Sequence, residues 1–357
     1  MVVHEVVVDY KVREVCAVNG GSYGGNRVNF AFIQLLKDSL GARFIERFIH
    51  ECPKQWQILM RKFERAKKID YIDKKGKTKK MSIDIPIVMA EMFNTQHSGN
   101  NFKEVINSLK EKGISFSKNG SLVLAFEVVE QLFMDTINHI IKGVQDLLDK
   151  VVSTGTQAKY MFMVGGFCDC SFLQNAVKQE FECKGIVIII PKEAQLAIVK
   201  GAVLFGQNEN HIVTRIARRT YGTGCAVPFD DAIHDRNCLH IDNDGFEWCN
   251  NIFVIFVEKG DEIEIGSCKE ISFTYHDDGD CMKIYSLDRK PVQVEYTDNP
   301  AIEELGSLFV PNPKELPKDR EIEVIIRMTF GSTEICVEAM DEQRCIIDTA
   351  SLDFLSS

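Results

Sequence analysis

The sequence lacks the features that place a chain in a membrane or in the secretory pathway. None of the apolar runs among its 357 residues is long enough to cross a bilayer. The first residues, Met1 to Glu5, show neither the basic nor the apolar segment of a signal peptide. With 45% hydrophobic and 26% charged residues, the composition is that of an ordinary soluble globular protein. We therefore expect a cytoplasmic protein without a membrane span.

Cysteine spacing that would indicate a metal site or a disulfide framework is also missing. The 12 cysteines are scattered along the chain, so reduced thiols are expected rather than disulfides. Cys168 and Cys170 flank Asp169, but no second cysteine or histidine pair with zinc spacing accompanies them. The sequence therefore predicts no metal site.

Positive charge is scarce in the C-terminal part of the chain. Residues 1–206 hold 28 Lys and Arg against 22 Asp and Glu, a net charge of +6, whereas residues 207–357 hold 14 against 30, a net charge of −16. This change predicts a domain boundary near residue 207, and the acidic half argues against nucleic acid as a partner. The basic stretch 61–80 is interpreted as solvated surface, with an anionic partner as the alternative.

A strand, a glycine pair and a helix follow one another at residues 160–174. The uncharged run from Tyr160 leads into Gly165 and Gly166, and an amphipathic run follows. Ser171 and Gln174 have the spacing of a capping box, which predicts a helix that begins at Ser171. Adjacent glycines permit positive φ and the close approach of another backbone or a flat ligand. Such turns hold ligands in many α/β folds, although a tightened crossover without a ligand remains the alternative.

Strands and helices alternate through the rest of residues 1–206. A valine-rich hairpin is expected over 2–18, and a glycine-rich turn at 19–26 leads into an apolar-periodic helix that reaches Leu40. Parallel strands joined through helices indicate an α/β layer. The remaining expected elements are helices that begin near Pro53, Asn101 and Phe126, strands at 81–87 and 186–190, a hairpin turn at 119–120, and a helix from Ala194 whose small residues would pack onto a sheet.

Three charged residues near the end of the expected helix from Pro53 share one face. Glu64, Lys67 and Lys68 stand at i, i+3 and i+4. They are interpreted either as an exposed Glu64–Lys68 ion pair, which contributes at most a few tenths of a kcal/mol, or as a polar clamp on the ribose and base of a ligand. Spacing alone leaves both interpretations open.

Short β-like runs replace the helices after Gln207. Turn residues at 260–261, 277–279 and 312–313 separate them, and no long helical pattern intervenes. This texture predicts an antiparallel β-sandwich. The expected strands are 251–257, 262–265, 270–275, 282–285, 292–296, 321–329 and 334–339.

Taken in order, these motifs resemble those of the 70-kDa heat-shock proteins, most closely their divergent 12A/12B branch. The resemblance covers nearly the whole chain. It is carried by Gly20-Gly21-Ser22-Tyr23-Gly24-Gly25, Phe63-Glu64-Arg65-Ala66-Lys67-Lys68, Val164-Gly165-Gly166-Phe167 and Pro191-Lys192-Glu193-Ala194 with Gly201-Ala202-Val203, and the branch by residues 220–224 and 330–335.

The resemblance implies an actin-like, ribonuclease-H-like ATPase domain followed by a β-sandwich. Residues 1–206 would be the second lobe of an incomplete nucleotide-binding domain, and 207–357 a domain like the family's substrate-binding domain without its helical lid. In this family the adenosine lies between the helix with the Glu-Arg-Ala-Lys motif and the glycine-pair turn. That assigns Glu64, Lys67 and Lys68 to one side of the site and Gly165, Gly166 and Phe167 to the other, with Gly24 and Gly25 nearby.

Parts of the family pattern are missing from the sequence. The first phosphate loop, the catalytic lysine and the Asp-Gly-Gly-Gly-Thr loop are not found, and phosphoryl transfer depends on such parts. We therefore assign no catalytic residue. Because the chain opens directly in a strand, we expect that the N-terminal lobe of the fold is absent. Phe167 and Asp169 also stand where the family usually has serine and arginine, and Lys192 replaces a usual aspartate.

The resemblance implies a heat-shock-type, ATP-binding, chaperone-like protein. It would hold ATP or ADP in a weak or partial site, with Mg²⁺ only if the missing lobe is present, and would hydrolyse little ATP. Its partners would be unfolded or client protein segments. The alternative is a non-catalytic protein-interaction module whose α/β lobe is a scaffold. A sugar or acetate kinase of the same superfold is a weaker possibility, because the acidic β-rich tail has no role in such enzymes.

Overall fold

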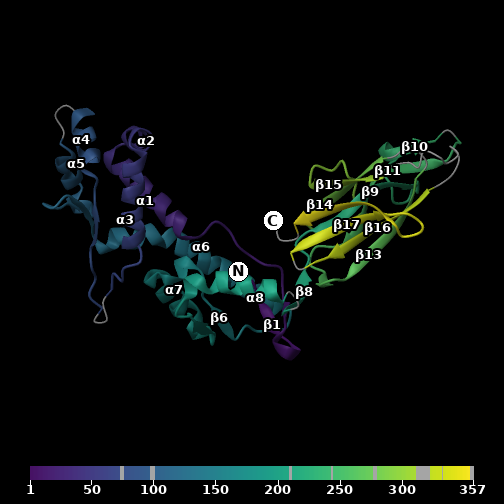
Figure 1. Ribbon diagram of the computed structural model, residues 1–357, viewed down its shortest axis with the longest axis horizontal. Helices are drawn as coiled ribbons and strands as arrows, with labels where there is room; N and C mark the ends of the chain where they lie inside the picture. Colours follow the sequence, from purple (N-terminus) through teal and green to yellow (C-terminus); the bar gives the residue numbers. More distant parts are fainter. Residues whose placement is uncertain are drawn as a thin grey trace. The chain divides into compact units, whose positions relative to one another are not determined.

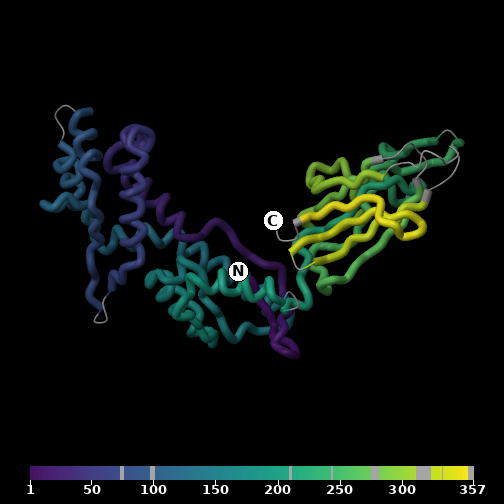
Figure 2. Tube along the Cα trace, in the orientation of Figure 1, coloured from purple at the N-terminus to yellow at the C-terminus, as the bar shows by residue number. Residues whose placement is uncertain are grey.

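The computed structural model describes residues 1–72, 76–96, 101–208, 211–242, 244–275, 280–310, 322–331 and 333–353 (Figures 1 and 2). The expected turns at 277–279 and 312–313 lie outside these ranges. Contacts divide the chain into two units. Unit 1 holds Met1 and Asn19–Gly206, and unit 2 holds Val2–Val18 and Gln207–Ser357. The division after residue 206 coincides with the change in charge along the sequence.

Unit 1 begins with three consecutive helices, α1 (Gly25–Leu40), α2 (Ala42–Glu51) and α3 (Pro53–Ala66). Helix α1 starts directly after the glycine-rich turn, and its buried residues recur every four positions from Val28 to Leu40. Gly41 ends α1 with a φ of 93°, a value that favours glycine. Pro53 occupies the first turn of α3, as its missing N–H group predicts.

A small antiparallel sheet in unit 1 has the strand order β3-β5-β4. Its strands are β3 (Met81–Asp84), β4 (Ile114–Phe116) and β5 (Ser121–Leu124), accompanied by α4 (Ile87–Gln96), α5 (Phe102–Ser108) and the 3-10 helix η2 (Lys110–Lys112). The predicted turn at Asn119-Gly120 joins β4 and β5, and Gly120 has a φ of 84°. The strand expected over 81–87 stops at Asp84, because the chain turns at Pro86 and α4 begins at Ile87.

The second half of unit 1 contains the predicted parallel strands. Strands β6 (Tyr160–Phe162) and β7 (Val187–Ile189) are parallel neighbours, and α7 (Ser171–Phe181) lies between them in the chain. Short 3-10 helices, η3 (Gly166–Asp169) and η4 (Glu182–Lys184), flank α7. Helix α7 packs against the long helix α6 (Phe126–Ser153), which the sequence predicted from its apolar periodicity (Figure 1).

Helix α8 (Ala194–Gln207) does not pack as its small residues predicted. All residues of α8 are described, and only Ala194 is buried. The prediction that α8 packs onto a sheet was wrong. Apolar residues occur on all sides of α8, so the helix has no single apolar face to bury. Its exposed apolar side chains are Leu196, Ile198, Val199, Val203 and Leu204, which are 42% to 64% exposed.

Unit 2 includes the N-terminal hairpin. Strands β1 (His4–Val6) and β2 (Val12–Glu14) pair antiparallel as predicted, with the 3-10 turn η1 (Val8–Tyr10) between them. Strand β2 runs parallel to β8 (Ile212–Ile216), which pairs with β12 (Glu262–Glu264). The structure thus groups residues 2–18 with the C-terminal part, whereas the sequence grouped them with residues 19–206. Parallel pairing between residues about 200 positions apart leaves no local pattern in a sequence.

A buried ion pair fastens β2 to β8. Arg215 donates from Nη1 to Oε1 of Glu14 at 2.8 Å, and the backbone N–H of Ile216 donates to Oε2 of Glu14 at 3.0 Å. Glu14 is 4% and Arg215 8% exposed. The two charges satisfy one another where water does not reach them.

Two larger antiparallel sheets share one core in unit 2. Figure 1 shows β9, β11, β14 and β15 along one side of this unit and β13, β16 and β17 along the other. Tyr221 and Ile284 from one sheet and Ile326 and Val337 from the other belong to the same buried cluster. The first sheet contains β10 (Leu239–Ile241), β11 (Glu247–Val257), β9 (Thr220–Pro228), β14 (Asp280–Leu287) and β15 (Ile302–Val310), and the second β13 (Cys268–Tyr275), β16 (Ile322–Phe330), β17 (Glu334–Met340) and β18 (Ile346–Asp353).

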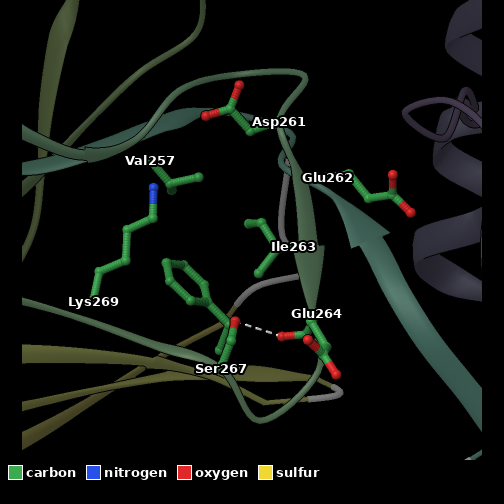
Figure 3. A pocket seen from close by; sticks show the side chains of 8 residues that line it. Val257, Asp261, Glu262, Ile263, Glu264, Ser267 and Lys269 are labelled. Carbon is green, nitrogen blue, oxygen red and sulfur yellow. Dashed lines mark hydrogen bonds between the residues drawn. The ribbon is translucent and has the colours of Figure 1, made fainter.

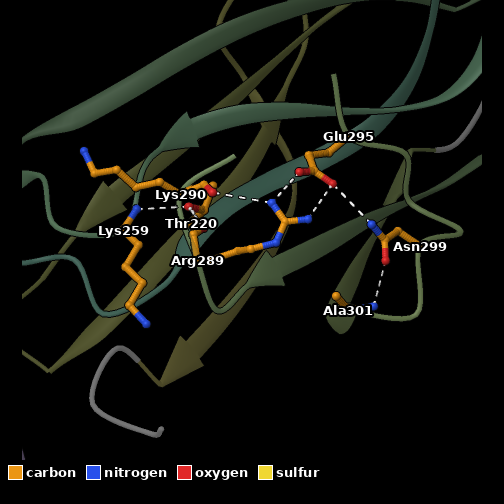
Figure 4. Close-up of polar contacts among 7 residues, drawn as sticks. All are labelled: Thr220, Lys259, Arg289, Lys290, Glu295, Asn299 and Ala301. Atoms are coloured by element: carbon orange, nitrogen blue, oxygen red, sulfur yellow. Dashed lines mark hydrogen bonds and ion pairs between the residues drawn. The ribbon is translucent and has the colours of Figure 1, made fainter. Parts of the chain in front are cut away.

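Residues 292–296, which the sequence predicted as a strand, form a loop held by polar contacts, with a single bridge from Tyr296 to Ile252. Figure 4 shows Arg289 and Asn299 directed at the carboxylate of Glu295. Arg289 donates to both oxygens of Glu295, at 2.5 Å and 3.1 Å, and Nδ2 of Asn299 donates at 3.2 Å. Because Glu295 is 5% exposed, these bonds fix the loop in place of a strand ladder.

Candidate functional site

Lys67 lies at the junction of α3 and α1 in unit 1. It forms the C-terminal cap of α3, and its side chain is 7% exposed. The ammonium Nζ donates to the Gly25 carbonyl at 2.9 Å, to Oδ1 of Asn29 at 2.7 Å and to Oε1 of Glu64 at 2.8 Å. An ammonium group has three donors. Each donor of Lys67 therefore has an acceptor within the protein.

Asn29 is a member of this cluster that the sequence interpretation missed. Its Nδ2 donates to Oε1 of Glu64 at 2.5 Å, while its Oδ1 accepts from Lys67. Asn29 follows Gly25 by one helical turn, so helical spacing places both on one face of α1. The sequence therefore showed that Gly25 and Asn29 share a face of α1. It did not show that this face contacts Lys67 and Glu64 of α3.

Glu64 presents a carboxylate whose side chain is 44% exposed. Burial opposes its charge, but the hydrogen bonds from Lys67 and Asn29 and the charges of Lys67 and Lys68 outweigh burial and lower the pKa of Glu64. Glu64 forms its ion pair with Lys67 and not with Lys68, the partner that spacing alone suggested. Lys68 is exposed beyond the end of α3.

The glycine-pair turn between β6 and η3 leaves its backbone open. Gly165 has a φ of 99°, and its N–H donates to the Ala194 carbonyl at 2.7 Å. A Cβ added at Gly165, Gly166 or Gly24 would meet no heavy atom of the described residues within 4 Å. Backbone at these three positions can therefore be approached closely.

Phe167 links the glycine-pair turn to the start of α1. Its half-buried ring lies parallel to that of Phe133 on α6, with the ring centroids 6.4 Å apart. A Cβ added at Gly25 would lie 3.5 Å from Cδ2 of Phe167 and 3.4 Å from Nζ of Lys67. Gly25 is therefore the point where the charged end of α3 and the glycine-pair turn meet.

The structure thus brings four of the predicted site residues, Gly25, Glu64, Lys67 and Phe167, into one cluster within unit 1. Of the other four, Gly24, Lys68 and Gly166 are adjacent in the chain to members of this cluster, and Gly165 stands two positions before Phe167. A bare backbone, a ring and a carboxylate that accepts hydrogen bonds are the groups that a nucleoside requires, so the residues present fit such a ligand.

Helix α7 begins at Ser171 as predicted, but the capping box is wrong. Cys170 is the N-cap residue, and the side chain of Gln174 donates to the Cys168 carbonyl at 2.7 Å. The 3-10 helix η3 directly precedes α7 in the chain. Its position brings the Cys168 carbonyl within hydrogen-bond distance of the Gln174 side chain. Burial, with the nearby charge of Asp169, raises the pKa of the Cys168 thiol to about 11, which keeps it protonated.

A separate hollow of about 270 Å³ lies in unit 2 and involves none of these residues (Figure 3). The buried side chains of Val257, Ile263 and Phe330 supply its apolar surface. The charged side chains of Asp261 and Lys269 also line it, and Ser267 donates to the Glu264 carbonyl at 2.6 Å.

Within the described ranges, no group of three or more His, Cys, Asp or Glu side chains could hold a metal ion. No helix in the described part of the chain has both the length and the apolar character needed to cross a membrane.

Comparison with known proteins finds the chain similar, over nearly its whole length, to divergent 70-kDa heat-shock proteins. It is 29% identical over 367 residues to heat shock 70 kDa protein 12A of Homo sapiens and to that of Mus musculus, and 28% identical over 354 residues to heat shock 70 kDa protein 12B of Homo sapiens. These alignments cover 97% to 100% of this chain but 51% to 52% of the relatives. The chain therefore spans about half the length of the curated relatives it matches. No family model matches it.

Proposed function

We propose that this chain is part of a heat-shock-type, chaperone-like protein that binds adenine nucleotide on unit 1. The observation that carries the proposal is the meeting of Lys67 and Phe167 at Gly25, which joins the two sides of the predicted adenosine site. The relatives named heat shock 70 kDa protein 12A and 12B support the same assignment. In this proposal residues 1–206 are the second lobe of an actin-like domain, and 207–357 form a β-sandwich that binds client protein segments.

Each side chain has a distinct task in this proposal. The half-exposed carboxylate of Glu64 accepts hydrogen bonds from the ribose hydroxyl groups. Gly165 and Gly166 let the flat base approach the backbone, and Phe167 offers a ring edge or face. Lys67 positions Glu64 and does not contact the ligand itself, because its three donors are already used within the protein. Lys68, which is exposed, supplies the cation for the ligand.

We further propose that the chain hydrolyses little or no ATP by itself. The phosphate loops and catalytic lysine that the family resemblance requires do not occur in this sequence. Mg²⁺ would enter with the family's other lobe, bound to the nucleotide's phosphates. Steady-state turnover by the purified chain tests this part, since sustained release of phosphate would contradict it.

A thermal-shift titration with ATP and ADP tests nucleotide binding. We expect the unfolding midpoint to rise with nucleotide concentration, because a ligand that binds only the folded state stabilises it. Glu64→Ala and Gly165→Val should abolish the rise. Glu46→Ala, which removes another ion-paired carboxylate, and Gly155→Val, which places valine at a comparable positive φ of 79°, are the matched controls that keep the response.

A flat response in the unmodified chain would instead support the alternative, in which unit 1 is a scaffold and unit 2 binds another protein. In both versions we propose a cytoplasmic protein with protein partners. The net charge of −16 on residues 207–357 argues against nucleic acid as a partner.

A further inference from the structure

Two thiols of unit 2 meet where β10 begins. Cys238 ends the 3-10 helix η6 (Arg236–Cys238) and directly precedes Leu239, which pairs with Cys249 in the ladder between β10 and β11. The side chains of Cys238 and Cys249 lie close enough to affect each other's pKa. The ladder and this mutual effect bring the two thiols together, although they stand 11 positions apart in the chain.

Tyr296 completes this cluster from the loop that follows β14. The backbone N–H of Asp235 donates to the Tyr296 hydroxyl oxygen at 2.7 Å, and the Tyr296 hydroxyl group lies close enough to Cys249 to affect the pKa of its thiol. Burial raises the pKa of the Cys249 thiol, and the nearby Tyr296 and Cys238 side chains offset only part of this effect. The thiolate is the nucleophile in thiol chemistry.

The two cysteines differ in their access to solvent. Cys249 is 0% exposed, whereas Cys238 is partly exposed. A small oxidant in solution therefore reaches the Cys238 thiol first. The buried Cys249 thiol can react only afterwards, with the oxidised Cys238. This is the arrangement of an exposed thiol poised next to a resolving thiol.

We propose that Cys238 and Cys249 are a modification site, where hydrogen peroxide produces a reversible disulfide. The Cys238 thiolate attacks one peroxide oxygen, the O–O bond breaks, and Cys238 becomes a sulfenic acid while the other oxygen leaves as water. The Cys249 sulfur then attacks the Cys238 sulfur, the S–O bond breaks, and a second water leaves with the thiol proton. Two thiols and one peroxide thus give one disulfide and two waters, and an external thiol reverses the product by exchange.

The disulfide would link the segment before β10 to the neighbouring strand β11. Strand β10 has only three residues and lies at the edge of its sheet. A covalent bond at Cys238, directly before its first residue, reduces the conformational freedom of the unfolded chain and stabilises this edge. Oxidation therefore should raise the unfolding midpoint of unit 2.

The reaction should be slow at neutral pH. Burial raises the pKa of both thiols, and at Cys238 the charges of Asp235 and Asp298 add to the effect of burial. Because the thiolate is the reactive form, the rate should rise as the pH is raised above neutrality.

Peptide mapping of the full chain tests the proposal without any substitution. The residues from Asn237 to Lys259 contain no internal Lys or Arg, so trypsin releases them as one peptide, and Cys238 and Cys249 are its only cysteines. After treatment with hydrogen peroxide and alkylation, we expect this peptide to carry no alkyl group. Its mass should be two hydrogen atoms lower than that of the same peptide with two free thiols. Reduction with dithiothreitol before alkylation should restore two alkylated cysteines.

Single-cysteine variants then test whether the disulfide forms between Cys238 and Cys249 and not with another cysteine of the chain. Cys238→Ser should leave Cys249 alkylated after peroxide treatment and abolish the rise in unfolding midpoint. Cys225→Ser, which removes another partly buried thiol of the same unit, should change neither result. The proposal is overturned if the 237–259 peptide keeps two alkylated cysteines while other thiols of the chain are oxidised, or if Cys238 is found bonded to a different cysteine.

Discussion

Nζ of Lys67 lies 2.9 Å from the carbonyl oxygen of Gly25, although 42 residues separate them in the chain. This hydrogen bond joins the C-terminal end of α3 to the first residue of α1. A side chain larger than a methyl group at position 25 would project toward both Lys67 and Phe167.

Lys67→Met should destabilise the chain by about 2–3 kcal/mol, because partly buried acceptors on Gly25, Asn29 and Glu64 would lose their donor. Urea-induced unfolding followed by circular dichroism measures the change. Lys68→Met is the matched control and should stay within about 0.5 kcal/mol of the unmodified chain, since Lys68 is exposed. Equal effects of the two substitutions would show that the Lys67 contacts do not stabilise the fold.

Gly25→Val should cost about 1–3 kcal/mol through overpacking against Lys67 and Phe167. Gly25→Ala should be nearly neutral, because its Cβ would lie at 3.4 Å and 3.5 Å from these two side chains, close to ordinary contact distance. The same denaturation experiment separates the two variants. If alanine and valine cost the same, the close approach at Gly25 is not the reason for glycine.

The stability of the chain should depend on pH partly through Glu64. Its pKa in the folded protein is lowered from the ordinary value of 4.5, so its contribution is fully present above that value and is lost as the pH falls through the lower folded pKa. Unfolding midpoints of the unmodified chain and of Glu64→Gln should therefore differ at neutral pH and converge in acid. The difference between the two chains isolates Glu64 from the other carboxylates, and a constant difference down to strong acid would contradict the assignment.

Glu14→Ala should cost about 3–5 kcal/mol, because it leaves the guanidinium of Arg215 buried without its partner. Glu14→Gln keeps the acceptor for Arg215 and should cost less. Glu5→Ala removes an ion pair with Arg13 from the same hairpin, where both side chains are about half exposed, and should cost much less than Glu14→Ala. Guanidinium denaturation of the three variants ranks them, and a Glu14→Ala effect no larger than that of Glu5→Ala would contradict the burial of this pair.

Local patterns in the sequence predicted most elements but not their partners. Apolar periodicity located α1 and α6, Pro53 located the start of α3, and Asn119-Gly120 located the turn between β4 and β5. The capping box at Ser171 and the strand at 292–296 were wrong, because the Cys168 carbonyl and the Glu295 carboxylate offered better hydrogen bonds from elsewhere in the fold. Strands β9, β15 and β18 were not predicted, because glycine or acidic residues interrupt their apolar residues.

The amino-acid sequence by itself determined most of the helices and several of the strands, the change of charge near residue 207 and the chemical types of the predicted site residues, since these depend on neighbours in the chain. Only the tertiary structure decided that Asn29 joins Lys67 and Glu64, that Phe167 faces Gly25, and that the hairpin at residues 2–18 pairs with β8. Such contacts join residues that are tens to hundreds of positions apart, and they form because buried donors, acceptors and charges must find partners wherever the folded chain brings them.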